Sequence, residues 1–178
     1  MRKLTHLEIV ERQQEQITQA PRLPVTIILN NIRSLHNVGS IFRTADGAGV
    51  EKIILCGITG YPPHSQITKT ALGAEMRVPW EFRRDILSVI KELRAKNYKI
   101  VLLEQMEGSI SYDEFFPTFP LALVIGNEIE GVSDQLVSHC DAAIEIEMAG
   151  EKNSLNVSVA AGIVMYYLRN AYKAILWT

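Results

Sequence analysis

Short apolar runs alternate along the chain with longer segments in which apolar residues recur every three or four positions. The runs are rich in β-branched residues and predict buried strands, whereas the wider spacing predicts amphipathic helices. Strands are expected at 25–30, 51–57, 99–104, 120–126 and 142–147, and helices near 3–19, 36–48, 84–97, 133–139 and 153–172. Because strands and helices alternate, we expect an α/β fold in which a mainly parallel sheet has helices on both faces.

An amino-terminal extension precedes this alternation. Residues 3–19 suit an amphipathic helix, and the proline-containing linker 20–24 ends it. We therefore expect a helical extension and linker at 1–24, followed by a single domain at 25–178. With 178 residues and 47% hydrophobic content, the chain can bury about 70% of its unfolded surface.

The net charge and the positions of the histidines and cysteines exclude several classes of function. A net charge of −2 and a pI of about 6.1 argue against a surface coated throughout for nucleic acid, so any RNA footprint must be local. The four histidines lack nearby cysteine or carboxylate partners, so no metal site is expected. Cys56 and Cys140 have no paired spacing and are expected to be buried thiols. No signal-like terminus or apolar run of about 18 residues occurs, which predicts a soluble, cytoplasmic protein without a membrane partner.

The polar start of the last helical segment is the most informative single feature. Within 151–162, uncharged polar side chains precede an apolar run with helical spacing, and Asn153 or Ser154 is predicted to cap the helix. The free N–H groups and the positive end of the helix dipole then suit a carboxylate, a phosphate or a developing negative charge. The alternative is a capped core helix that binds nothing.

Two further polar segments follow predicted strands. Asn37 and Arg43 lie on the polar side of a helix that begins near the carboxyl end of strand 25–30, where open α/β sheets bind ligands. Strand 120–126 ends at Gly126, which predicts a close approach of ligand and backbone. Arg43 could equally be a solvated helix charge.

The loop after the second of these strands carries Asn127 and Glu128 to the same edge of the sheet. The alternative there is that Gly126 and Gly131 only bracket a turn.

Together and in this order, the three segments resemble the sequence motifs of the SpoU/TrmH family of RNA ribose 2′-O-methyltransferases, part of the knotted SPOUT class. The likeness rests on the spacing of Asn37 and Arg43, on residues 125–128 with Gly131, and on residues 154–158. Residues 69–75 resemble the segment between the first two motifs. The resemblance covers roughly residues 23–170.

The resemblance implies a deep trefoil knot in the carboxyl-terminal part, with S-adenosylmethionine bound bent inside it. Matching positions place Gly126, Ile146, Met148 and Leu155 in the cofactor pocket, with Glu104 and Asn127 at its edge. It also implies a homodimer in which the first motif of one subunit reaches the cofactor of the other. The tail 166–177 is aromatic and apolar, which agrees with a surface that a second subunit covers.

The implied reaction is attack by a ribose 2′-hydroxyl on the sulfonium methyl group, so the protein must position reactants, remove a proton and stabilise charge. The family's activating arginine corresponds to Arg43. A guanidinium normally stays protonated, so Arg43 needs an RNA phosphate or Glu128 to shift its proton, or it stabilises the developing alkoxide. Asn37 is expected to orient Arg43 or the ribose, Ser154 and Asn156 to hold the target nucleotide, and Glu128 to orient other groups.

The leading hypothesis is therefore an S-adenosylmethionine-dependent RNA 2′-O-methyltransferase that acts on tRNA or rRNA. The alternative of a catalytically silent, knotted RNA-binding dimer is disfavoured by a complete set of candidate catalytic residues: Arg43, Asn37, Glu128, Ser154 and Asn156. A flavodoxin-like small-molecule binding module also fits the α/β pattern, because a fold does not determine function.

Overall fold

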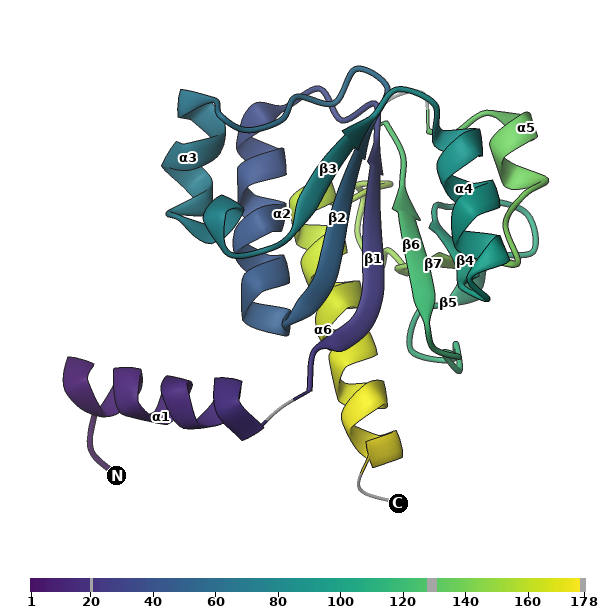
Figure 1. Cartoon of the computed structure of the whole chain (residues 1–178). Helices are drawn as coiled ribbons and strands as arrows, with labels where there is room; N and C mark the ends of the chain where they lie inside the picture. The colour runs from purple at the N-terminus through teal and green to yellow at the C-terminus, as the bar shows by residue number, and fades with distance from the viewer. Residues whose placement is uncertain (20, 128–130, 177–178) are drawn as a thin grey trace.

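The computed structural model describes residues 1–19, 21–127 and 131–176 and consists of helices on both faces of a parallel sheet (Figure 1). The helices are α1 His6–Gln19, α2 Leu35–Ala48, α3 Ser65–Ala71, the 3-10 helix η1 Ala74–Met76, α4 Ile86–Ala95, α5 Asp134–Val137 and α6 Val157–Leu176. The strands are β1 Leu23–Asn30, β2 Val50–Cys56, β3 Trp80–Arg83, β4 Lys99–Leu103, β5 Ile110–Ser111, β6 Leu121–Ile125 and β7 Ala142–Glu145. The predicted α/β class with a parallel sheet is confirmed.

Alternate side chains of the central strands point to opposite faces of the sheet and build two cores. In β1, Ile27 packs in the core beneath α2, α3 and α6, whereas Ile28 packs in the core beneath α4 and α5. Because both faces are covered, β1 and β6 are apolar at nearly every position rather than alternating with polar residues. This explains why the sequence shows short continuous apolar runs.

The order of the strands places a switch point at the centre of the sheet. In the described part of the chain, the order is β3-β2-β1-β6-β4-β7-β5. The chain moves outward from β1 through β2 and β3, and β6 later enters between β1 and β4. In open α/β sheets, a crevice forms at the carboxyl ends of the strands beside such a reversal. The polar loops after β1, β6 and β4 all emerge there.

Helix α2 is held closely by its neighbours. Ser34 caps its start by accepting a hydrogen bond from the Asn37 N–H at 3.3 Å, and Gly49 ends it with a φ of 70°. A Cβ atom on Gly39 would lie only 2.3 Å from the carbonyl oxygen of Ile67, so α3 packs directly against the α2 backbone. On another side, α6 crosses α2, where a Cβ on Gly162 would lie 3.5 Å from Thr44.

Four short elements were not predicted. Helix α3 and η1 lie between strands, within a segment that shows little apolar periodicity, and only Ile67 and Ala71 of α3 are buried. Strand β3 has four half-buried residues and β5 has two residues at the sheet edge. Neither strand is long or buried enough to produce the apolar run that revealed the others. The remaining elements agree with the predicted ones in type, and most bounds shift by one to three residues.

Helix α1 lies apart from the three layers and leads into β1 (Figure 1). Its described side chains are exposed, apart from a half-buried Glu8. Among the residues described here, no helix is both long and apolar enough to cross a membrane.

Candidate active site

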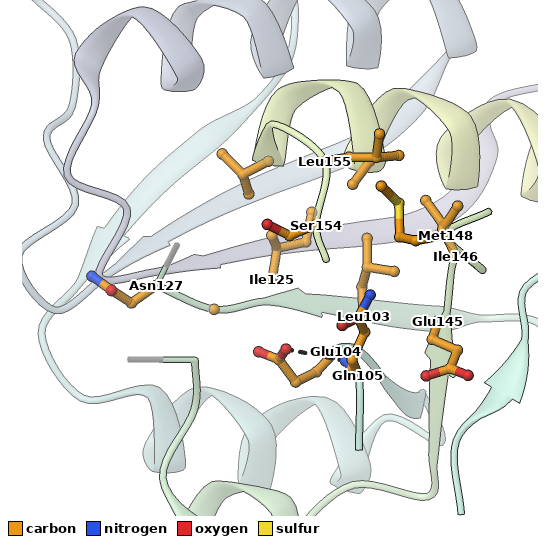
Figure 2. Close-up of a pocket in the computed structure, with 13 residues that line it drawn as sticks. Leu103, Glu104, Gln105, Ile125, Asn127, Glu145, Ile146, Met148, Ser154 and Leu155 are labelled. Carbon is orange, nitrogen blue, oxygen red and sulfur yellow. Dashed lines mark hydrogen bonds between the residues drawn. The ribbon is translucent and has the colours of Figure 1, made fainter. Parts of the chain in front are cut away.

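A cavity opens at the carboxyl ends of β4, β6 and β7, beneath the segment that leads into α6 (Figure 2). It is lined by Leu103, Glu104, Gln105, Ile125, Gly126, Asn127, Glu145, Ile146, Met148, Ser154, Leu155, Val157 and Ala160. All six residues predicted to hold the cofactor are among them. The structure therefore brings together residues from three separate parts of the sequence, although their role as cofactor ligands stays a prediction.

Strand register explains why these residues meet. Leu103 of β4 pairs with Ile125 of β6 on one side and with Ile144 of β7 on the other. The three strands therefore end at the same level, and the next residues, among them Glu104 and Gly126, surround one opening. Apolar strand ends form the floor of the cavity, and polar residues lie at its rim.

Gly126 allows the loop after β6 to fold back on itself. The N–H of Asn127 donates to the carbonyl of Gly131 at 3.2 Å, and the reverse bond is 3.0 Å. A Cβ on Gly126 would lie 2.5 Å from Val132 Cγ1 and 3.0 Å from the Gly131 carbonyl oxygen. The missing side chain of Gly126 makes room for the returning loop, and the expected approach of a ligand to its backbone stays a prediction. The predicted residue Glu128 lies outside the described residues.

The side chain of Asn127, just after β6, forms a hydrogen bond that links this loop to the end of β1. It is 8% exposed, and its Nδ2 donates to the carbonyl of Asn31 at 2.9 Å, just beyond β1. Asn31 has a positive φ of 60°, and its own side chain accepts a hydrogen bond from the Ile58 N–H. Figure 2 shows the Asn127 amide pointing away from Leu155. Its amide thus fixes the loop after β6 to the end of β1, and its backbone lies at the cavity edge.

The start of α6 differs from the prediction. The helix begins at Val157, and its cap is Asn156 rather than Asn153 or Ser154. Asn156 Oδ1 accepts a hydrogen bond from the Ser158 N–H at 2.9 Å, and its carbonyl accepts from the Ala160 N–H. All three polar residues are able to cap a helix, and the sequence alone could not distinguish them. Ser154 is consequently free of the helix and lines the cavity.

A second depression adjoins the cavity. It is lined by Arg33, Ser34, Asn37, Ser154, Leu155, Asn156 and Val157. Asn156 Nδ2 donates to Asn37 Oδ1 at 3.2 Å, which joins the starts of α2 and α6. Ser154, Leu155 and Val157 line both hollows. The cavity and the depression are adjacent and share one lining segment, 154–157. This arrangement suits a reaction in which a group passes between two bound molecules.

Comparison with known proteins identifies the family. Residues 24–166 match the model of the SpoU rRNA Methylase family. This chain belongs to the SpoU family. A 23S rRNA guanosine-2′-O-methyltransferase of Pectobacterium atrosepticum is 35% identical over 144 residues, which cover 81% of this chain and 59% of that protein. This SpoU chain spans 57–59% of the length of the first curated relatives that it matches.

Two solved structures support the fold of this SpoU chain. The A. aeolicus TrmH/SpoU tRNA modifying enzyme has a TM-score of 0.81 at 27% identity, covering 96% of this chain and 86% of that one. An rRNA methyltransferase from Sinorhizobium meliloti with bound AdoMet has a TM-score of 0.77 at 28% identity, covering 85% and 61% respectively. The resemblance inferred from the three motifs is thereby confirmed.

Among the predicted catalytic residues that the structure describes, Arg43 alone lies away from the cavity and the depression of this SpoU chain. It is exposed and lines neither of them. Six residues of helix rotate its direction by about 120° from that of Asn37. Asn37, Ser154 and Asn156 do gather at the second depression. The predicted catalytic set is thus divided in space within one chain.

Sequence reasoning missed two charged residues of the site. Arg33 lines the depression and Glu145 lines the cavity. Arg33 lies in the loop between β1 and α2, four residues before Asn37, and Glu145 is the last residue of β7. Their position near the ends of strands at the common edge of the sheet was the signal for both.

The cysteines contribute no chemistry to this site. Cys56 is fully buried and Cys140 is half-buried, so the expected burial is complete only for Cys56. Burial raises the pKa of the Cys56 thiol to about 12 and that of Cys140 to about 11. Both thiols stay protonated near neutral pH and are poor nucleophiles.

Proposed function

We propose that this SpoU chain uses S-adenosylmethionine to methylate a ribose 2′-hydroxyl in tRNA or rRNA. The observation that carries the proposal is that the cavity and the depression lie side by side, because Ser154, Leu155 and Val157 line both. The names of the relatives support it: one is a 2′-O-methyltransferase of rRNA, one modifies tRNA, and one carries AdoMet.

The cavity fits the chemistry of the cofactor. Ile146, Met148 and Leu155 offer apolar surface for an adenine ring, and the backbone at Gly126 offers hydrogen-bonding groups beside it. The Glu104 carboxylate and Asn127 stand at the rim. When bound, S-adenosylmethionine supplies a methyl group on a positively charged sulfur. The residues of this chain then need only to hold and orient it.

The depression fits the RNA side of the reaction. Arg33 supplies positive charge suited to a backbone phosphate, and the amides of Asn37 and Asn156 suit ribose hydroxyls. Ser154 lies where the two hollows meet. We place the target ribose there, with its 2′-oxygen directed at the cavity. Glu128 keeps its expected orienting role within the proposal.

Arg43 enters the proposed site from a second subunit. It lies on an exposed surface, the α2–α6 face, formed by Arg43, Gly47, Val159 and Tyr166. Val159 and Tyr166 are each about half exposed, and apolar side chains gathered in this way favour a partner. A homodimer packed through this face brings Arg43 to its partner's hollows.

The chemical step leaves Arg43 protonated. The ribose 2′-oxygen forms a bond to the methyl carbon and loses its proton, while the bond between that carbon and sulfur breaks. A guanidinium does not readily accept the proton, so Arg43 stabilises the developing alkoxide, and an RNA phosphate accepts the proton.

Three further features belong to this proposal. They are the trefoil knot in the carboxyl-terminal part, the division into an extension at 1–24 and a domain at 25–178, and a cytoplasmic location. Each follows from the resemblance or the sequence pattern and stays a prediction.

The direct test is transfer of labelled methyl groups from S-adenosylmethionine to bulk tRNA and, separately, to bulk rRNA. Digestion to nucleosides should place the label in 2′-O-methylated ribose. Label on a base instead would contradict the proposed position of the reaction. RNA binding without transfer to either pool would favour the catalytically silent RNA-binding dimer.

Comparison of 2′-O-methyl maps from cells with and without the protein then identifies the target nucleotide.

A further inference from the structure

The two adjoining hollows carry opposite charge. Glu104 and Glu145 line the cavity, and no Lys, Arg or His appears among its described lining residues. The depression has Arg33 as the only charged side chain among the described residues that line it. Two substrates of opposite charge therefore meet surfaces of complementary sign.

The Glu104 carboxylate is held in place at one end of the cavity. Its Oε1 accepts a hydrogen bond from the Gln105 N–H at 3.0 Å. Its Oε2 lies against the returning loop, since a Cβ on Gly131 would be 2.8 Å away. Figure 2 shows the carboxylate directed toward the end of the cavity where Asn127 lies. This position keeps the negative charge close to whatever occupies the cavity.

Neither carboxylate is neutralised by an ion pair within residues 1–19, 21–127 and 131–176. Both side chains are half-buried, so water screens them only in part. A cation bound in the cavity therefore gains attraction that a neutral ligand of the same shape does not gain.

We propose that Glu104 and Glu145 make the cavity selective for the charge of the cofactor, so that S-adenosylmethionine binds more tightly than its product S-adenosylhomocysteine. The inference rests on the proposed function. The two molecules share the adenosine and amino-acid parts and differ in the methyl group on the sulfur and in the positive charge that it confers there. Loss of that charge on methyl transfer weakens binding and promotes release of the product.

The test is direct binding, measured by calorimetry on the full chain, with three ligands. S-adenosylmethionine and sinefungin carry a positive charge at or beside the position of the sulfur, and S-adenosylhomocysteine is neutral there. Wild-type protein should bind both cationic ligands more tightly than the neutral one. Glu104→Gln preserves the shape and the acceptor of the Gln105 bond, and should weaken the cationic ligands by about three- to tenfold while S-adenosylhomocysteine changes less than about twofold.

Glu145→Gln should act in the same direction, and the double variant should remove most of the preference. Glu147→Gln is the matched control, because Glu147 lies two residues away, is exposed and does not line the cavity. It should leave all three affinities unchanged at physiological salt, where the screening length is about 8 Å. Thermal denaturation of each variant checks that it is folded.

Two results would overturn the proposal in different ways. If wild-type protein binds all three ligands equally, or if the variants weaken all three equally, charge selectivity is wrong and the proposed function stands. If wild-type protein binds none of them, both the selectivity and the proposed cofactor site are wrong.

Discussion

Asn37 and Arg43 belong to one helix and one motif, yet they have different surroundings. Asn37, at the start of α2, is half-buried and accepts a hydrogen bond from Asn156 of the same chain. Arg43 lies six residues further along, about 1.7 turns, is exposed, and belongs to the α2–α6 face. A single chain therefore completes the part of the site that contains Asn37 and leaves Arg43 outside it.

This difference shows that a continuous sequence motif need not form a continuous site. The direction of each side chain is determined by the rotation of α2, which α3 restrains at Gly39 and α6 at Thr44. If the rotation were different, Asn37 would lose Asn156. The proposed homodimer resolves the division, because Arg43 then serves the hollows of the other subunit.

The largest effect should come from Arg43→Ala. We expect a loss of about 100- to 1000-fold in the rate of methyl transfer, the usual result of removing a group that stabilises a developing oxyanion. Affinity for S-adenosylmethionine, measured by calorimetry, should stay within a few fold because Arg43 lines neither hollow of its own chain. Arg43→Lys should restore only part of the rate, since lysine lacks the forked donors. Near-normal turnover of Arg43→Ala would remove Arg43 from the mechanism.

Mixed dimers test most directly whether Arg43 of one subunit serves the hollows of the other subunit. Arg43→Ala subunits keep intact hollows, and Asn156→Ala subunits keep an intact Arg43. If Arg43 acts across the dimer, a heterodimer of the two contains one complete site and should recover about half of the wild-type activity per dimer. Differently tagged subunits allow the heterodimer to be purified and assayed.

The matched control is a heterodimer of Arg43→Ala with a subunit that carries both substitutions, which contains no complete site. Recovery in neither heterodimer would mean that each site is built from one chain.

The sequence predicts the framework of this molecule better than its site. Continuous apolar runs revealed the central strands because those strands are covered on both faces, and the same runs place polar loops at a common edge. Contacts between distant segments could not be read in this way. Asn127 looked like a ligand-binding residue, but its amide binds the backbone of Asn31, 96 residues earlier. The contact of Gly126 with the returning loop could not be read from the sequence for the same reason.

Gly39→Ala should have the next largest effect, by disturbing the rotation of α2. The added methyl group would lie 2.1 Å from Thr70 Oγ1 and 2.3 Å from the Ile67 carbonyl oxygen, and the backbone of α3 cannot easily move away. We expect the free energy of unfolding to fall by about 2 kcal/mol, although alanine is the better helix former.

Gly162→Ala is the control, because its Cβ meets Thr44 at an ordinary 3.5 Å and the helix should gain up to about 1 kcal/mol. Urea denaturation measures both. Equal stability of the two variants would show that α3 does not clamp α2.

The smallest effect is expected from Asn156→Asp, which tests the hydrogen bond between Asn156 and Asn37. In Asn156→Asp, the carboxylate can still accept the hydrogen bonds from Ser158, and negative charge at a helix start is favourable. Stability should therefore change by less than about 0.5 kcal/mol. The donor to Asn37 is lost, however, and two acceptors face each other, so methyl transfer should fall about tenfold. Asn156→Ala removes both contacts and should also lose about 1 kcal/mol of stability as the cap disappears. Comparing thermal unfolding with transfer rates separates the role of Asn156 as a helix cap from its role as a donor to Asn37. Full activity in Asn156→Asp would show that the hydrogen bond to Asn37 is not needed for methyl transfer.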